Sequence, residues 1–510
     1  MKGVGTEKLL FFILEEWKLI LLLTIIFALY SYYTSTFDFF EKKGIKYMKP
    51  TIFLGNLGPR LFPKKSYYEN QLDIYNYFKG SPCGGMFEGT IPILYIFNPD
   101  LLKAITIRDF DYFVDRNSLN SNKPRFLSRS LLNLKGSEWK GVRSILTPSF
   151  SSSRLKNMLP LLESCSQQMI EYLNKYDNKD VEMKDAMGYY TLETIGVCAF
   201  GIKCDALSDE NAHFAKVVKK FMDISLPKRI YILLVLMLMP KMIRYLNISF
   251  INPEATGELV KMLKATKAER RASNVKRNDF LQLVLDAADE ERHENGKREI
   301  HLDDDTIDAQ SLLFLIAGYE TSSTLLSFAI YVMATKPELQ SKLRNHVIEV
   351  IKGKDLDYDV LSQLSYLEAF LLETLRMYTP ISRVDRVCTK DYTLPMTSIR
   401  IKAGDLIALP LCGVHMDPDI YPNPHEFRPE RFMGEEKNQR PSHLFLAFGA
   451  GPRNCIGSRF AMFSVKLAMV SLLKNFKFTT GPKTEIPVKF NKKRLMLSPE
   501  NGLWVHVEKL

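Results

Sequence analysis

The sequence lacks the cysteine patterns of zinc sites and of disulfide-rich secreted domains. Its seven cysteines are an odd number and lie far apart, and none forms a C-x-x-C pair or stands near a histidine at zinc-ligand spacing. Scattered, unpaired thiols are typical of a chain kept in a reducing compartment. We therefore expect the body of the protein to face the cytosol.

The chain also lacks Gly/Ser-rich linkers, low-complexity tracts and internal repeats, the features that divide long chains into separate units. Its 510 residues would suffice for about two to four domains of ordinary size. Of these residues, 46% are hydrophobic and 25% are charged, which is the composition of a globular protein with a large core. We expect one large folded unit after a short N-terminal segment.

No zinc-finger, basic-zipper or RNA-binding signature accompanies the net charge of +11, which argues against a nucleic-acid-binding protein. An anionic membrane surface or an acidic protein partner fits this charge better. One group of basic residues is predicted to form a solvated helical face and the loop after it. Its members are Lys261, Lys264, Lys267, Arg270, Arg271, Lys276 and Arg277.

Long apolar runs are scarce, and the run from Trp17 to Tyr33 is near the lower limit for a membrane-spanning helix. Its terminal aromatic residues suit the two membrane interfaces, and the lysines of residues 42–49 place the downstream body in the cytosol. No small-residue cleavage site follows, as a secretory signal requires, and the first arginine, Arg60, comes too late for a mitochondrial presequence. We expect residues 1–45 to form a membrane anchor and linker, with a transmembrane helix at about 17–33.

A second apolar stretch, Ile230 to Met239, is too short to span a membrane. Lys228, Arg229, Lys241 and Arg244 bracket it. Two interpretations stay open: a segment of the core, or a monotopic patch that dips into the same membrane as the anchor. The second would place a substrate entrance at the lipid.

One cysteine, Cys455, lies in a loop with Gly449, Gly451 and Gly457, just before a segment that predicts a helix from about Ser458 to Phe476. Backbone N–H groups and the positive helix end stabilise an anion there, which predicts a lowered thiol pKa. The glycines allow a tight backbone that approaches a flat ligand closely. Taken alone, the thiol is as consistent with a buried free cysteine as with a thiolate ligand of haem iron.

A long apolar helix is predicted from about Asp304 to Thr335, ended by Pro337. Residues 317–322, Ala-Gly-Tyr-Glu-Thr-Ser, interrupt its apolar character. Gly318 costs the helix about 1 kcal/mol relative to alanine. The interruption is either an ordinary surface turn or a bulge that makes room for a ligand and water, where the acid and hydroxyls pass protons to a bound oxygen species.

Two further pairs of side chains have functional spacing. Glu373 and Arg376 are three residues apart on one predicted helix face, and Arg431 is a candidate third member of a buried ion-pair group. Trp139 and Arg143 place an indole donor and a guanidinium one turn apart, where both reach one carboxylate. Each pair taken singly is an ordinary helix contact.

Together, these segments occur in an order that resembles the cytochrome P-450 family of haem-thiolate monooxygenases. The resemblance spans roughly residues 35–505, and the pattern Phe-x-x-Gly-x-Arg-x-Cys-x-Gly is filled at every fixed position of residues 448–457. Residues 317–322 and 385–392 resemble the membrane-bound microsomal members, especially the detoxifying enzymes of animals and insects.

The resemblance implies a role for each residue that matches a family motif. Cys455 would be the axial ligand of the haem iron, and Phe448 would pack near its sulfur. Partners of the haem propionates would be Trp139, Arg143, Arg386, Arg453 and, as a weaker match, Arg116.

Three further roles follow from the same resemblance. Glu373, Arg376 and Arg431 would form a buried network that supports the Cys455 loop. Thr321, with Glu320 beside it, would guide protons to iron-bound dioxygen. The distal substrate pocket would be lined by Phe314, Ile316, Ala317, Ile381 and Ser382.

The implied fold is mainly α with a smaller β-rich region: a single haem-binding domain, residues 46–510, after the transmembrane helix. The implied activity inserts one oxygen atom of O2 into a lipophilic substrate, either a xenobiotic or an endogenous lipid or hormone. The implied cofactor is haem b, with electrons from NADPH through NADPH–cytochrome P-450 reductase and with cytochrome b5 as a second candidate partner. The implied location is the cytosolic side of the endoplasmic reticulum membrane. A proximal face around Lys140, Arg143 and Arg453 is the expected contact with an acidic reductase.

Two other functions remain as alternatives. A haem-thiolate isomerase or dehydratase would rearrange a peroxide without external electrons. Such an enzyme would not need Glu320 and Thr321 to deliver protons to O2, so their presence argues against it. A membrane-anchored haem-binding or lipid-binding protein would lack catalysis, which the complete cysteine motif argues against.

The sequence departs from the family pattern in two places. The proline-rich hinge after the anchor is reduced to residues 46–50, Lys-Tyr-Met-Lys-Pro, and the double proline after the Glu373 helix is Thr379-Pro380. The first departure affects how the body is oriented on its anchor, and the second affects the edge of the pocket.

Overall fold

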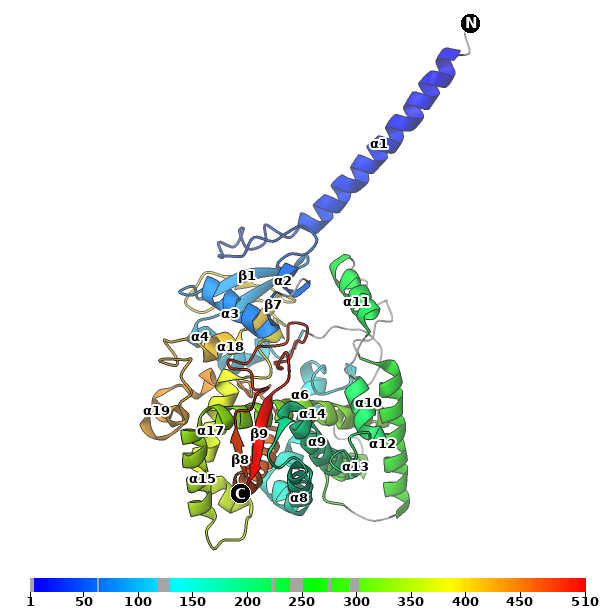
Figure 1. Ribbon diagram of the computed structural model, residues 1–510. Coiled ribbons are helices and arrows are strands. Elements are labelled where there is room, and N and C mark those ends of the chain that lie inside the picture. The colour runs from blue at the N-terminus through cyan, green and yellow to red at the C-terminus, as the bar shows by residue number, and fades with distance from the viewer. Residues whose placement is uncertain are drawn as a thin grey trace.

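The computed structural model describes residues 4–61, 64–117, 128–221, 225–238, 251–273, 277–293 and 302–510. Helices dominate these residues, and the smaller sheets lie among them (Figure 1). The helices are α1 Val4–Thr34, α2 Gly58–Leu61, α3 Tyr67–Tyr77, α4 Pro99–Lys103, α6 Gly136–Leu146, α7 Ser152–Asn157, α8 Leu159–Asn174, α9 Met183–Ile195, α10 His213–Phe221, α11 Leu226–Leu238, α12 Pro253–Ser273, α13 Phe280–His293, α14 Asp304–Thr335, α15 Pro337–Ile351, α16 Tyr358–Gln363, α17 Ser365–Met377, α18 Leu411–His415, α19 Gly434–Gln439 and α20 Ser458–Asn475. The strands are β1 Cys83–Glu88, β2 Ile91–Ile96, β3 Lys179–Glu182, β4 Val384–Val387, β5 Tyr392–Thr393, β6 Arg400–Ile401, β7 Leu406–Leu409, β8 Phe476–Thr479 and β9 Trp504–Lys509.

The long helix α14 runs through the centre of the body and confirms the bounds predicted from the sequence (Figure 1). The side chain of Asp303 caps its first turn by accepting the backbone N–H of Thr306. Pro337 starts α15 directly after it, since proline lacks the donor that a continuing helix requires. Although α14 is apolar enough to cross a membrane, most of it is buried among other helices, as in the core of a soluble domain.

A four-stranded sheet, in the order β1-β2-β7-β4, positions one of the predicted haem partners. β1 and β2 form an antiparallel hairpin, β2 and β7 are parallel, and β7 and β4 are antiparallel. In the last pair Arg386 lies opposite Ile407, at the sheet edge formed by β4. A separate three-stranded sheet, β3-β9-β8, continues from the C-terminal end of α20.

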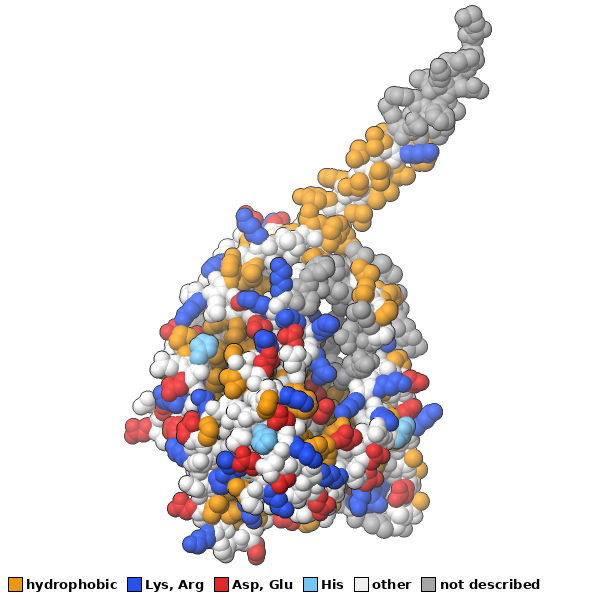
Figure 2. Space-filling model, viewed as in Figure 1, with side chains coloured by type: hydrophobic (Ala, Val, Ile, Leu, Met, Phe, Trp, Pro, Cys, Tyr) orange, Lys and Arg blue, Asp and Glu red, His pale blue; other side chains and the backbone are white. Residues whose placement is uncertain are grey.

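The N-terminal helix α1 projects away from the body, and the described part of its surface is mostly hydrophobic (Figure 2). Residues Trp17–Thr34 have a mean hydropathy of 1.5, and only 6% of this window is buried. A helix of this length and composition is a candidate membrane span, as predicted.

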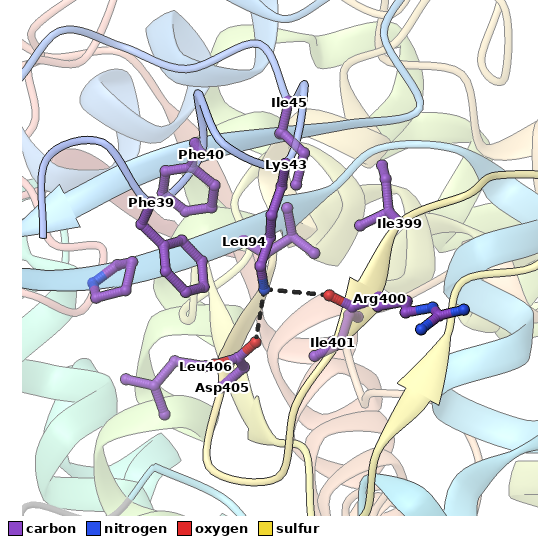
Figure 3. Close-up of a pocket in the computed structure, with 11 residues that line it drawn as sticks. Phe39, Phe40, Lys43, Ile45, Leu94, Ile399, Arg400, Ile401, Asp405 and Leu406 are labelled. Atoms are coloured by element: carbon purple, nitrogen blue, oxygen red, sulfur yellow. Dashed lines mark hydrogen bonds and ion pairs between the residues drawn. The ribbon is translucent and has the colours of Figure 1, made fainter.

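The segment after α1 is attached to the body by aromatic contacts instead of a proline-rich hinge. Phe40 is fully buried, and its ring centroid lies 5.1 Å from that of Phe87 on β1. A side chain at Gly85 would overlap the Phe40 ring, so the glycine makes this contact possible. Lys43 donates to the Asp405 carboxylate and to the Arg400 carbonyl, both at 3.1 Å (Figure 3).

The second apolar stretch is α11, which lies at the end of the body from which α1 emerges (Figure 1). Ile230, Tyr231 and Leu234 are about half exposed, whereas Ile232 and Val235 are buried. The helix therefore has one apolar face on the body and a second apolar face outside it. Residue 239, the last of the predicted stretch, lies outside the described residues.

The basic group of residues 261–277 is only partly the solvated face that we expected. Lys267 is 4% exposed and forms an ion pair with Asp308 on α14. Arg270 is 5% exposed and forms an ion pair with Asp279 at 2.6 Å. Both side chains face the interior between α12, α13 and α14, where burial requires a partner of opposite charge. Arg271, by contrast, is exposed, and residue 276 lies outside the described residues.

Candidate active site

The Cys455 loop is a tight turn that depends on two of its three glycines. The Cys455 backbone N–H donates to the Phe448 carbonyl at 2.7 Å, which closes the loop. Gly449 and Gly451 have φ of +73° and +69°, a region that other residues adopt only with strain. A side chain at Gly451 would also overlap the carbonyl oxygen of Thr106. Gly457 has φ of −88° and room for a side chain, so its expected role in the turn is not supported.

Cys455 differs from the other six cysteines, because its side chain is exposed and theirs are buried. The surrounding protein nevertheless removes much of the water around the thiol, and this desolvation raises the pKa of Cys455 above the ordinary value. The Gly457 backbone N–H, Arg143 and Arg116 each lower this pKa, but together they do not offset the burial. The prediction of a lowered thiol pKa for Cys455 is therefore wrong in direction, although the predicted lowering by a backbone N–H group is present. The accessible thiol still differs from a packed core cysteine.

Helix α14 presents a gap in its packing at the interruption predicted from the sequence. Ala317 is exposed and Thr321, one turn later, is half-buried, whereas residues 322–334 are buried. The Thr321 hydroxyl donates to the Ala317 carbonyl at 2.6 Å. The helix continues through this turn without the bulge considered above. A Cβ atom at Gly318 would lie 2.8 Å from Ile195, so this glycine allows α9 to pack closely.

The carboxylate of Glu320 is engaged by two cations. It lies 3.2 Å from Lys184 Nζ on α9 and 3.8 Å from Arg494. Lys184 also donates to the hydroxyls of Ser323 and Thr324, at 2.7 and 2.8 Å. Burial lowers the pKa of Lys184, and Glu320 opposes that shift. The sequence did not reveal Lys184, because a single lysine in the first turn of a helix carries no recognisable motif.

Four predicted haem partners form a cationic group around the Cys455 loop. Burial lowers the pKa of Arg116, Arg143, Arg386 and Arg453, to about 9 for the last two. Mutual repulsion lowers it further, as between Arg116 and Arg386. Among the described residues, none of the four forms an ion pair with a carboxylate. The nearby Asp385 carboxylate is instead bound to Arg383, at 2.7 Å.

Unsatisfied donors in this group show what kind of ligand fits it. The Nε atoms of Arg116 and Arg386 and the indole Nε1 of Trp139 are buried and have no hydrogen-bond partner among the described residues. Buried donors without acceptors are rare in proteins, and each such group calls for an explanation. Clustered guanidinium groups with free donors match the carboxylates of a haem. The residues present therefore fit this cofactor.

Arg453 has a structural role that the sequence did not predict. Its guanidinium donates to the carbonyls of Val114, Leu131 and Leu134, at 2.8, 3.0 and 2.6 Å. It also lies 4.2 Å above the Trp139 ring, a favourable cation–π arrangement. Because Arg453 is only 2% exposed, it is not available to an external protein partner, contrary to our expectation for the proximal face.

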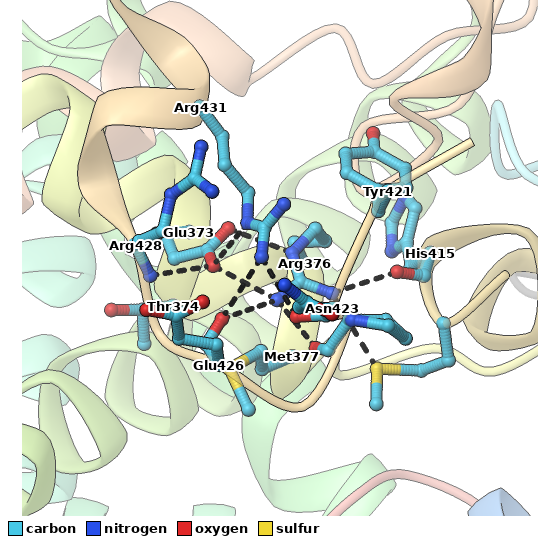
Figure 4. Close-up of polar contacts among 12 residues, drawn as sticks. Glu373, Thr374, Arg376, Met377, His415, Tyr421, Asn423, Glu426, Arg428 and Arg431 are labelled. Carbon is cyan, nitrogen blue, oxygen red and sulfur yellow. Dashed lines mark hydrogen bonds and ion pairs between the residues drawn. The ribbon is translucent and has the colours of Figure 1, made fainter. Parts of the chain in front are cut away.

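The predicted ion-pair network is present and fully buried (Figure 4). Both Glu373 oxygens accept from Arg376, at 2.7 and 2.9 Å, and one also accepts from Arg431 at 3.3 Å. The arginines then donate to the carbonyls of Pro424 and Asn423, each at 2.8 Å. These contacts tie α17 to the chain that leads to the Cys455 loop. Removing one member of such a network leaves an unpaired buried charge and costs about 3–5 kcal/mol.

The five predicted pocket residues do not share one environment. Ala317 is exposed, Ile381 is 42% exposed, and Ile316 is half-buried against the core. Phe314 is 7% exposed and belongs to a cluster of aromatic rings that includes Phe150 and Phe280.

Ser382, the last of the five, is 1% exposed, and its carbonyl accepts the Cys412 N–H at 3.3 Å. The structure therefore places Phe314 and Ser382 in the buried part of the body, and their role in lining a pocket stays a prediction.

Comparison with known proteins identifies the family. The family model described as Cytochrome P450 matches residues 50–506. The chain belongs to the cytochrome P450 family.

Several full-length relatives support this assignment. "Cytochrome P450 9e2" of Blattella germanica is 36% identical over 513 residues, covering 95% of this chain and 96% of the relative. "Cytochrome P450 6a8" of Drosophila melanogaster is 34% identical, with 94% and 97% covered. "Cytochrome P450 3A41" of Mus musculus is 34% identical, with 97% and 96% covered. Insect and mammalian relatives of this kind match the animal microsomal type that the motifs indicated.

Membership of this cytochrome P450 family establishes the class of reaction. The protein is a haem-thiolate monooxygenase, and haem b is the cofactor of its family. When bound, the haem supplies the activation of O2, and the thiolate ligand favours O–O cleavage. The protein itself supplies binding, orientation and electrostatics.

Proposed function

We propose that this cytochrome P450 is a membrane-bound monooxygenase of the endoplasmic reticulum that oxidises lipophilic substrates on the cytosolic side. The observation that carries the proposal is one arrangement: an accessible Cys455 thiol on a tight glycine loop, surrounded by buried and half-buried arginines without carboxylate partners among the described residues. Residues 1–45 would be the anchor and linker, and residues 46–510 the catalytic domain.

Cys455 would bind the haem iron, with Phe448 beside the sulfur. Arg116, Arg143, Arg386, Arg453 and Trp139 would hold the propionates. The three unpartnered donors, on Arg116, Arg386 and Trp139, support this assignment, because each gains an acceptor when a carboxylate is bound.

Proton supply would use Thr321 and Glu320. The Thr321 hydroxyl is accessible at the turn where α14 opens; its proton is donated to the Ala317 carbonyl, so its oxygen can accept a hydrogen bond from the site. The Glu320 carboxylate is held next to Lys184 and to Arg494, whose side chain is 61% exposed. The Glu320 side chain is itself 19% exposed, which gives it contact with the solvent from which a proton must come. Glu320 itself would be the second catalytic group.

The substrate would enter from the lipid. The exposed face of α11, with Ile230, Tyr231 and Leu234, lies at the same end of the body as the anchor. A helix with an apolar outer face beside a transmembrane anchor is suited to the membrane interface. A lipophilic substrate partitions into that interface, so this position favours xenobiotics, lipids and hormones over polar metabolites.

Electrons would come from NADPH through NADPH–cytochrome P-450 reductase, with cytochrome b5 as a second donor. A depression of about 450 Å³ on the surface is lined by Arg108, Lys140, Arg143 and Pro452, among others. Pro452 is three residues from Cys455, so a donor seated there would lie close to the proposed iron ligand. The cations at its edge suit an acidic partner.

The deciding experiment is the absorption spectrum of the reduced, CO-bound protein in membranes. The wild type should show the band of thiolate-bound haem, and Cys455→His should lose that band while it still binds haem. Cys83→Ala, which removes a buried thiol from β1, is the control and should keep the band. A wild-type protein without the band would contradict the proposal.

A turnover screen with reductase and NADPH would then separate the remaining functions. Oxygenated products from lipophilic toxins, hormones or fatty acids would support a monooxygenase. Turnover of a lipid hydroperoxide without reductase would instead indicate an isomerase or dehydratase. The thiolate-haem band without NADPH consumption for any ligand would indicate a non-catalytic binding protein.

A further inference from the structure

Helix α14 carries a fully buried glutamine, Gln310, two turns before the exposed Ala317. Its side-chain oxygen accepts the Leu131 backbone N–H at 2.7 Å. Its side-chain nitrogen donates to the carbonyl of Arg129 at 2.7 Å and to that of Thr306 at 3.2 Å. A buried amide in an apolar helix is tolerated only when it is hydrogen-bonded in this way. Gln310 therefore fastens residues 129–131 to α14.

The segment held by Gln310 is the one that holds Arg453. The Leu131 carbonyl accepts from Arg453 Nη1 at 3.0 Å, while the N–H of the same residue is bound by Gln310. The Leu134 carbonyl accepts from Arg453 Nη2 at 2.6 Å. Between them, a turn is closed by bonds from the N–H groups of Asn133 and Leu134 to the Ser130 carbonyl. The two carbonyls that orient Arg453 thus belong to one short turn attached to Gln310.

Arg453 is two residues before Cys455, and all its described hydrogen bonds go to main-chain carbonyls. Two of these three carbonyls are in the turn of residues 130–134. A guanidinium held by neutral acceptors keeps its full charge, and its position depends on the acceptors. A displacement of this turn would therefore move a buried cation that belongs to the Cys455 loop, in an interior where the low effective dielectric makes charge interactions strong.

We propose that Gln310 is a positioning residue, which fixes the Arg453 guanidinium relative to the haem through the turn of residues 130–134. The inference rests on the proposed function of Cys455 and Arg453. It links the helix that faces the substrate space to the loop that carries the iron ligand. A buried cation beside the haem favours the reduced form, because reduction adds one negative charge. Loss of Gln310 should therefore lower the reduction potential as well as the stability.

A matched control is present elsewhere in the fold. Gln340 on α15 is 3% exposed, its oxygen accepts the Phe478 N–H at 2.9 Å, and its nitrogen donates to the carbonyls of Phe478 and Met333. It therefore bonds to the backbone in the same way as Gln310, with one further bond accepted from Arg344 at 3.4 Å, but it fastens β8 instead of the turn that holds Arg453. Gln340→Leu should cost similar stability without changing the charge near Cys455.

The test uses the haem-loaded wild type, Gln310→Leu and Gln340→Leu, each characterised by urea unfolding and by spectroelectrochemical redox titration. Both substitutions should lower the free energy of unfolding. Only Gln310→Leu should lower the reduction potential. At a fixed potential, the ratio of reduced to oxidised protein should fall about fivefold, which corresponds to the free energy of about one net hydrogen bond. Gln310→Asn, which keeps the amide, should shift the reduction potential less and in the same direction. It is the test variant if Gln310→Leu does not fold.

Arg453→Lys completes a double-mutant cycle. If Gln310 acts through Arg453, the change caused by Gln310→Leu in the reduction potential should be reduced in the Arg453→Lys background. An unchanged potential in both Gln310 variants, or an equal shift in Gln340→Leu, would overturn the proposal. A wild-type protein without the thiolate-haem band would overturn the proposed function itself, which is a separate outcome.

Discussion

His415 connects the buried ion-pair network to the Cys455 loop, and no motif in the sequence marked it. Its carbonyl accepts from Arg376 at 2.8 Å, and its ring Nε2 accepts the Leu446 backbone N–H at 2.8 Å. The ring is fully buried and stacks on Phe445. Burial, with repulsion from Arg376, lowers its pKa to about 3. The fold therefore holds a neutral imidazole at the start of the loop.

This neutral imidazole makes the protein sensitive to mild acid. Below the ordinary histidine pKa of about 6.5, the unfolded chain binds a proton on this residue and the folded chain does not. Stability that is fully present above pH 6.5 is thus lost as the pH falls toward 3. Relative to His415→Gln, which keeps an acceptor, the wild type should lose about 1.4 kcal/mol between pH 7.5 and 5.5. Urea unfolding of both proteins at the two pH values measures this difference.

His425 provides the control for the acid effect. Its side chain is exposed, ten residues from His415. In His425→Gln, the free energy of unfolding should change between pH 7.5 and pH 5.5 by the same amount as in the wild type. If His415→Gln behaved like His425→Gln, the assignment of acid sensitivity to the buried ring would be incorrect.

Spacing revealed those residues whose partners lie close along the chain, whereas Arg431, 58 positions from Glu373, was indicated by its match to a family motif. Glu373 and Arg376 meet because they are three residues apart on one helix, and Gly451 is required by the turn that it occupies. Contacts between distant segments left no such pattern. The carbonyls that bind Arg453 come from residues more than 300 positions away, and the partner of Lys267 is on another helix. Such partners are determined by packing, which spacing does not encode.

Among the elements, the predictable ones were long helices with explicit ends. α14 matched its predicted bounds because Asp303 caps it and Pro337 stops it, and α20 ended one residue before the predicted Phe476. The two-residue strands β5 and β6 were not predictable, since so few residues show no alternation of apolar and polar side chains.

The linker between α1 and the body was also unforeseen as a structured element. Its reduced proline content suggested that the orientation of the body on the anchor would be poorly fixed. However, Tyr33 and Phe40 are buried, and Met48 donates its N–H to the Gly85 carbonyl at 3.0 Å. The Lys43 ammonium lies 4.0 Å from the Phe39 ring as well as bonding to Asp405 (Figure 3). Aromatic packing and one half-buried ion pair therefore attach the linker where a stiff proline segment would otherwise be expected.

Breaking this ion pair should loosen the linker. Lys43→Asp places two carboxylates together at a site where each side chain is 23% exposed. A loss of about 1–2 kcal/mol would raise the detached population about 5–30-fold. Protease cleavage between anchor and body, measured in membranes, should accelerate by a similar factor. The double exchange Lys43→Asp with Asp405→Lys should restore most of the resistance.

Lys42 provides the control for this measurement. It pairs with Asp38 at 2.5 Å, but the two side chains are 72% and 51% exposed, so the pair is worth little. Lys42→Asp should leave the cleavage rate nearly unchanged. Equal acceleration by both substitutions would show that net charge in the linker, and not the contact with Asp405, sets the rate.

In the proposed function, the whole molecule would bind a membrane and an electron donor with different parts of its surface. The anchor and the outer face of α11 lie at one end of the body (Figure 1). The depression beside Pro452 carries Arg108, Lys140 and Arg143, and it is lined by the loop that contains Cys455. A net charge of +11 distributed over the chain attracts acidic partners in general, so only local charges at the depression can orient one of them.

Lys140 is the charge through which this orientation can be tested. Its ammonium is 55% exposed and 2.8 Å from Asp111, so Lys140→Gln removes one cation and leaves an exposed anion beside the depression. Reduction by the flavoprotein reductase, followed by stopped flow at low ionic strength, should slow about two- to fivefold. The difference should vanish near 1 M salt, where the Debye length is about 3 Å. Lys477→Gln on β8, which breaks a partly exposed pair with Glu508 of β9, should not change the rate. If Lys140→Gln and the wild type showed the same dependence on salt, the donor would have to approach by another surface.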